Sequence, residues 1–93
     1  MDISLRGKFA IVCGSSQGIG LAAAKELAVN GANCILMARN PEALQAAVGL
    51  LTVTGDQHHQ WVAVDFSDNR QVEEAIKKIV DKQRIEILIN NTG

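Results

Sequence analysis

Three glycines lie close together near the start of the chain, at Gly14, Gly18 and Gly20. They follow an apolar run and precede a stretch rich in alanine and leucine, which predicts a strand, a tight turn and a helix. Glycines permit such a turn and let the backbone approach a ligand, while the first amides of the helix can bind an anion. The pattern is typical of a phosphate-binding turn, although a loop whose glycines serve only the turn would look the same.

Polar side chains follow the other apolar runs of the chain. Arg39 follows the second run, Asp65 the third, and the stretch 90–93 the fourth. In an open parallel sheet, ligands bind at the carboxyl ends of the strands, where the strand order reverses. We therefore expect the glycine turn and the stretch 90–93 to lie together. For Asp65, a role in capping backbone amides is an equal alternative to ligand binding.

The chain alternates between four apolar runs and three stretches of helical character. The predicted strands cover residues 8–13, 33–38, 60–64 and 85–89, and the predicted helices cover 18–30, 41 to about 53, and a third region capped by Ser67 or Asp68. This alternation predicts a doubly wound parallel sheet with right-handed crossovers, of α/β class. The commonest order of such a sheet is 3-2-1-4.

Apolar periodicity predicts which helix faces are buried. Ile19, Ala23 and Leu27 recur along the first helix, and Leu44, Val48 and Leu51 along the second. The third helix has the clearest stripe, formed by Val72, Ala75, Ile76, Ile79 and Val80.

Composition excludes several classes of function. The chain has 93 residues, is 47% hydrophobic and carries a net charge of −1, so it has no basic field for nucleic acid or an anionic membrane. It shows no signal peptide and no apolar stretch long enough to span a bilayer, and we expect a cytoplasmic protein. Cys13 and Cys34 are expected to be buried thiols and not a redox pair, and His58 and His59 to lie in a loop and not to bind a metal.

The motifs together carry a resemblance to a family. The run Gly14-Ser15-Ser16-Gln17-Gly18-Ile19-Gly20, with Asp65 and Asn90-Asn91-Thr92-Gly93, resembles the short-chain dehydrogenase/reductase family, in particular its 3-oxoacyl-acyl-carrier-protein reductases. The chain is similar to the cofactor-binding first half of that family's domain. Residues 1–93 are thus expected to form a partial NAD(P)-binding Rossmann domain that is truncated after its fourth strand. Cys13 and Thr92 depart from the family's usual Thr and Ala.

The resemblance implies a role for each matching residue. Asp65 would accept a hydrogen bond from the adenine amino group, Phe66 would meet the ring through its backbone, and Asn91 would contact the cofactor near the adenosine ribose. The pyrophosphate and its ribose would be wrapped by the turn, through Gly14, Ser16, Gln17, Gly18, Ile19 and Gly20.

The end of the second predicted strand bears on the choice of nicotinamide cofactor. An NAD enzyme places a carboxylate there for the ribose 2′-hydroxyl, but this chain has Ala38 followed by Arg39. A guanidinium can pair with a 2′-phosphate through its planar fork, which favours NADP(H) over NAD(H). The alternative is that Arg39 is only a solvated residue at a strand end.

The resemblance also implies catalysis by a Ser and a Tyr-x-x-x-Lys pair, but this chain contains no tyrosine. We expect the NADP(H)-binding portion of an oxidoreductase acting on a carbonyl or hydroxyl substrate such as a 3-oxoacyl thioester, with no catalytic residue and inactive alone. The alternative is a non-catalytic nucleotide-binding fragment or pseudoenzyme. The family implies a homo-oligomer for the full-length form, and the truncated form is expected to self-associate through its fourth strand.

Overall fold

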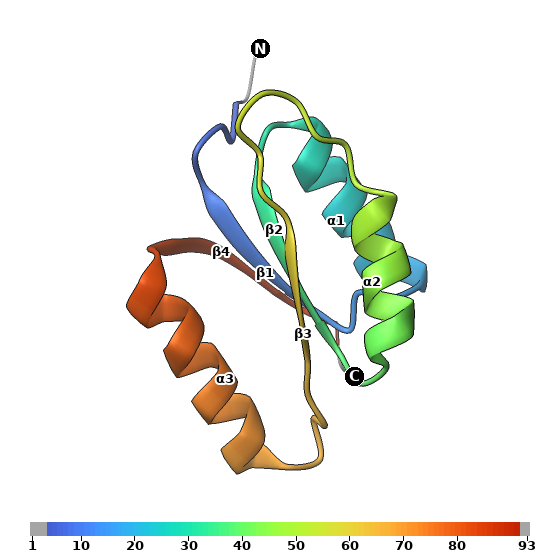
Figure 1. Cartoon of the computed structure of the whole chain (residues 1–93), viewed down its shortest axis with the longest axis vertical. Coiled ribbons are helices and arrows are strands. Elements are labelled where there is room, and N and C mark those ends of the chain that lie inside the picture. Colours follow the sequence, from blue (N-terminus) through green and yellow to red (C-terminus); the bar gives the residue numbers. More distant parts are fainter. Residues whose placement is uncertain (1–3, 92–93) are drawn as a thin grey trace.

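The computed structural model describes residues 4–91. Four parallel strands form one sheet in the order β3-β2-β1-β4, as the alternation predicts. Helices α1 and α2 cover one face of this sheet and α3 covers the other (Figure 1). The elements in chain order are β1 (Phe9–Cys13), α1 (Gly18–Val29), β2 (Asn33–Ala38), α2 (Pro41–Gly49), β3 (Gln60–Ala63), α3 (Asn69–Lys82) and β4 (Ile85–Asn90).

The two central strands are apolar on both sides because helices cover both faces of the sheet. Val12 and Leu36 are buried against α1 and α2, whereas Ile11 and Met37 are buried on the side of α3. The two clusters make an aliphatic core, in keeping with a chain that is only 3% aromatic.

The buried stripe of α1 is offset by one residue from the predicted one. Gly20, Ala24 and Ala28 are buried, while the side chain of Ile19 is 78% exposed. These small residues let the helix axis come close to β1 and β2, which a stripe of larger side chains would prevent. The prediction of Ile19 as a core residue was therefore wrong.

Helix α2 is shorter than the apolar periodicity predicts, because it ends at Gly49 and not near Val53. The amides of Leu50 and Leu51 donate to carbonyls only three residues back, which tightens the last turn. The chain then buries Leu51, which is 5% exposed, without continuing the helix. A glycine at the end of a helix favours such a stop.

Helix α3 has an N-cap at Asp68, whose side chain accepts a hydrogen bond from the Gln71 amide. Its stripe is less buried than predicted: Ile79 is buried, Val72, Ala75 and Ile76 are partly buried against the core, and Val80 is 48% exposed.

Strand β4 is an edge of the sheet in the described part of the chain, and it pairs with β1. Its residues alternate between half-buried and exposed, and Leu88 is 62% exposed. Leu88 pairs with Ile11 and so belongs to the face that α3 covers, but α3 does not extend over it.

Cys13 and Cys34 are buried free thiols on opposite faces of the sheet, as expected. Burial raises the pKa of Cys13 and raises that of Cys34 to about 11, so both stay protonated at neutral pH. His59 lies in the loop before β3, where its Nδ1 accepts from the Cys34 amide at 3.0 Å. Residues 4–91 contain no group of three metal-ligating side chains, and none of their helices has the length and apolarity to cross a membrane.

Candidate functional site

The three glycines of the turn each have a physical reason to lack a side chain. Gly14 and Gly18 have φ of 71° and 63°, in the left-handed region that other residues rarely adopt. A Cβ on Gly20 would lie 2.2 Å from the carbonyl oxygen of Gly14, so the turn and the first turn of α1 are in direct contact. Around Gly18, by contrast, an added Cβ would meet no atom within 4 Å, which leaves open space on the outer side of the turn.

Within residues 4–91, no side chain caps the amino end of α1. Gln17 is its N-cap residue and makes no side-chain capping hydrogen bond, and the first turn holds no acidic residue. In α2 and α3, the side chains of Asn40 and Asp68 cap the first amides. The amides of α1, with the positive end of the helix dipole, are thus suited to bind an anion.

Two hydrogen bonds anchor the turn to the sheet. The Gly14 amide donates to the Met37 carbonyl at 2.8 Å, and the Ser15 hydroxyl donates to the Val12 carbonyl at 2.7 Å. Ser15 is fully buried, so its hydroxyl holds the backbone and does not face solvent. No separate role was predicted for Ser15. Its small size and its place directly after Gly14, just beyond the end of β1, were the available signals.

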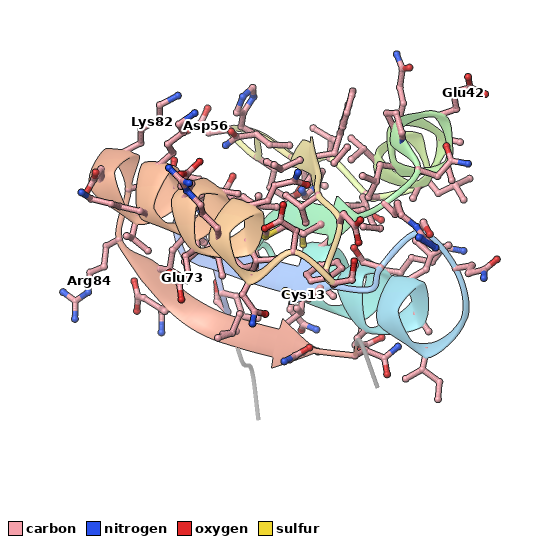
Figure 2. All side chains as sticks on the ribbon, turned by 90° about the horizontal axis from the view of Figure 1, so that it is seen from below. Cys13, Glu42, Asp56, Glu73, Lys82 and Arg84 are labelled. Atoms are coloured by element: carbon pink, nitrogen blue, oxygen red, sulfur yellow. The ribbon has the colours of Figure 1, made fainter. Side chains whose placement is uncertain are left out.

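The end of β4 lies beside the glycine turn. The Asn91 amide donates to the Cys13 carbonyl at 3.1 Å, which joins the residue after β4 to the residue before Gly14. Figure 2 labels Cys13 at this end of β1. The predicted meeting of the two strand ends at the reversal of strand order is therefore confirmed for Asn91. Thr92 and Gly93 lie outside the described residues.

A second group of side chains lies at the ends of β2 and β3. Arg39, Asp65, Phe66 and Ser67 line a hollow of about 250 Å³. The two strand ends are joined where the Val64 amide donates to the Ala38 carbonyl at 2.8 Å. Arg39 is exposed and Phe66 is half-buried.

The carboxylate of Asp65 is held by Ser67. Its Oδ1 accepts from the Ser67 hydroxyl at 2.7 Å and from the Ser67 amide at 3.0 Å. These two bonds, together with the positive charge of Arg39, hold the pKa of Asp65 below its usual range. Asp65 is therefore ionised at neutral pH. Ser67 was predicted only as an alternative cap of the third helix, and its hydrogen bonds to Asp65 were not predicted, although an aspartate commonly bonds the backbone two residues on.

The strand order aligns these groups along the carboxyl edge of the sheet. Asp65 follows β3, Arg39 follows β2, the glycine turn follows β1, and Asn91 follows β4. A cation, a carboxylate and a row of free helix amides thus lie along one edge, an arrangement suited to an extended ligand that carries several phosphates.

The family model described as short chain dehydrogenase matches residues 8–93. The chain belongs to this family. It is 42% identical to the 3-oxoacyl-[acyl-carrier-protein] reductase FabG of Chlamydia pneumoniae and 37% identical to the Inactive hydroxysteroid dehydrogenase-like protein 1 of Homo sapiens, over 100% and 94% of its own length. The structure of L-sorbose reductase from Gluconobacter frateurii, complexed with NADPH and L-sorbose, superposes on the short-chain dehydrogenase fold of this chain with a TM-score of 0.88 at 35% identity, over 100% of this chain.

The chain spans only part of these proteins. It covers 38% of the Chlamydia reductase, 26% of the human protein and 36% of the sorbose reductase chain. The similarity therefore concerns the glycine turn and the first four strands of the short-chain dehydrogenase fold.

Proposed function

We propose that this chain is the NADP(H)-binding portion of an oxidoreductase acting on a carbonyl or hydroxyl substrate, such as a 3-oxoacyl thioester. The observation that carries the proposal is the uncapped amino end of α1 behind the Gly14–Gly20 turn. The turn would hold the pyrophosphate against the first amides of α1, with Ser16, Gln17 and the exposed Ile19 beside it. Asn91, joined to Cys13, would contact the cofactor near the adenosine ribose.

The residues at the end of β2 support NADP(H) as the preferred cofactor. Arg39 is exposed beside the hollow, and the preceding residue, Ala38, has no carboxylate to accept from a ribose 2′-hydroxyl. A guanidinium there would pair with the 2′-phosphate. The complex of the related sorbose reductase with NADPH supports the same choice.

The adenine would lie in the hollow that Arg39, Asp65 and Phe66 line. Ionised Asp65 accepts hydrogen bonds and cannot donate them, which suits the exocyclic amino group of adenine. Phe66 would meet the ring through its backbone.

The bound nicotinamide would supply or accept a hydride, while the residues of this chain bind and orient the cofactor. The sequence contains no tyrosine, so the proton donor that the family resemblance implies is not among its residues. We therefore propose that the chain alone binds NADP(H) without turnover. We also propose that the protein acts in the cytoplasm.

A non-catalytic nucleotide-binding role is the second candidate. It is favoured by the human relative, whose name describes it as inactive. The two candidates share the cofactor site and differ in whether a substrate is turned over.

The test of cofactor binding is a titration of the purified chain with NADPH, followed by the fluorescence of the reduced nicotinamide. We expect saturable binding that NADP⁺ displaces and that Gly20→Ala weakens. A chain that is folded by circular dichroism and shows no saturable NADPH binding would refute the proposed function.

A further inference from the structure

Asp65 is held in place by several hydrogen bonds at once. Its Oδ1 accepts from both the amide and the hydroxyl of Ser67, at 3.0 and 2.7 Å. Its own amide donates to Oε1 of Gln71 at 2.6 Å, and its carbonyl accepts from the Asp68 amide at 3.0 Å. The backbone and the carboxylate of Asp65 are therefore both fixed relative to the start of α3.

The distribution of these bonds over the carboxylate matters for recognition. Both bonds end on Oδ1, and no residue within 4–91 donates to Oδ2. Oδ2 thus keeps its full capacity to accept a hydrogen bond, at the hollow that Arg39 and Phe66 also line. An ionised carboxylate with one fixed oxygen and one available oxygen is a selective acceptor for an N–H donor.

The Ser67 hydroxyl has no other structural task in the described chain. Asp68 caps α3, through its bond from the Gln71 amide, and the Asp68 amide closes the turn onto the Asp65 carbonyl. Ser67 itself is exposed and belongs to neither core cluster. The hydroxyl contacts Oδ1 of Asp65, so its removal would leave the carboxylate held by the Ser67 amide alone, with the cap and the turn in place.

We infer that Ser67 is a positioning residue that makes the site select a base with an exocyclic amino group over a base with an oxo group at the same position. It acts through Asp65: with Oδ1 held by Ser67, Oδ2 accepts from the amino group of adenine, whereas the carbonyl of hypoxanthine would place two acceptors against each other. The inference rests on the proposed binding of NADP(H).

The experiment compares NADPH with its reduced hypoxanthine analogue, in which the adenine amino group is replaced by an oxo group. Dissociation constants are measured by nicotinamide fluorescence for the wild-type chain and for Ser67→Ala, Ser67→Thr and the control Ser4→Ala. We expect the wild type and the control to prefer NADPH. We expect Ser67→Ala to reduce that preference by about three- to tenfold, the typical effect of one hydrogen bond.

Two further readouts separate positioning from general damage. Ser67→Thr keeps the hydroxyl and should restore the preference, and the ratio of NADPH to NADH affinity, which depends on Arg39, should stay unchanged in all variants. If Ser67→Ala keeps the full preference for adenine, the inference is overturned while the proposed function stands. If the wild type binds both nucleotides equally, Asp65 does not select the amino group and the inference is again overturned. If the wild type binds neither, the proposed function itself fails.

Discussion

A Cβ atom on Gly20 would lie 2.2 Å from the carbonyl oxygen of Gly14 and 2.9 Å from its carbonyl carbon. The amino end of α1 is therefore packed directly onto the turn that precedes it, with no room for a side chain. This contact determines where the first amides of α1 lie relative to the end of β1.

Replacement of Gly20 by alanine should destabilise the chain and displace the turn. Because the clash is with backbone atoms, we expect a loss of about 1–3 kcal/mol in the free energy of unfolding, together with weaker NADPH binding. Gly49→Ala is the matched control, since a Cβ there meets no atom within 4 Å and the residue ends α2. Urea unfolding of both variants provides the measurement, and equal effects on stability would show that the contact is not required.

Replacement of Arg39 by alanine should remove the preference for NADPH over NADH. The loss of a charge-assisted pair with the 2′-phosphate is expected to weaken NADPH binding by about 10- to 100-fold and leave NADH binding nearly unchanged. Arg84→Ala is the control. Arg84 directly precedes β4, at the amino ends of the strands, and its side chain extends away from the carboxyl end of β1 that carries Cys13 (Figure 2). An Arg39→Ala chain that keeps its wild-type preference would disprove the assignment.

The preference for adenine should be lost only when the pH falls below the ordinary pKa of a carboxyl group. The bonds from Ser67 and the charge of Arg39 lower the pKa of Asp65, so its ionised form is favoured in the folded chain. Because the pKa of Asp65 is lowered, the carboxylate and its preference for adenine are present at neutral pH. Both are lost only as the pH falls through the pKa of Asp65 in the folded chain, which lies below the ordinary pKa of a carboxyl group. The ratio of NADP⁺ affinity to the affinity of its oxidised hypoxanthine analogue, measured by calorimetry with these acid-stable nucleotides from pH 7 downward, should therefore stay constant through mildly acidic pH and fall only near and below the ordinary carboxyl value. A decline that begins near pH 6 would contradict the assignment of this preference to Asp65.

The exposed edge at β4 should make the isolated chain associate. Strand β4 pairs with β1 on one side, and Leu88 is 62% exposed on its surface, a combination that favours pairing with another strand. We expect Leu88→Lys to shift the chain toward monomer in sedimentation velocity runs across a range of concentrations. Leu50→Lys, at a site 60% exposed beyond α2, should leave the association unchanged. If the wild type remains a monomer at every concentration, β4 is not an association site.

The order and pairing of the strands could be predicted because each strand is a short apolar run between helical stretches. The sites at strand ends followed from that order, as the contact between Asn91 and Cys13 shows. Apolar periodicity alone could not predict which face of α1 packs on the sheet. The buried residues are the small Gly20, Ala24 and Ala28 and not the larger apolar residues. The end of α2 depends on where the chain buries Leu51, which is a tertiary effect.

The hydrogen bonds of Ser67 and Gln71 to Asp65 were also not predicted from the sequence. They are made by two side chains that reach back across the turn from β3 to α3, at 2.6 and 2.7 Å, and by the Ser67 amide at 3.0 Å. Only the folded backbone brings these groups together. Residue types alone left capping and ligand binding as equal alternatives for Asp65. In the structure, Asp68 caps α3, and the Asp65 carboxylate accepts from the backbone amide of Ser67 while it also lines the hollow beside Arg39. The capping interpretation is thus confirmed for one amide, and ligand binding by Asp65 stays a prediction.

Binding of NADPH at the glycine turn is tested most directly by a nuclear magnetic resonance titration of the ¹⁵N-labelled chain with NADPH, which reports on each backbone amide. We predict that the largest shifts occur at Gly18, Ile19 and Gly20, with further shifts at Arg39, Asp65 and Asn91. Shifts that are confined to the groove between β3 and α3, at residues such as Val62, Lys78 and Gln83, would contradict this prediction.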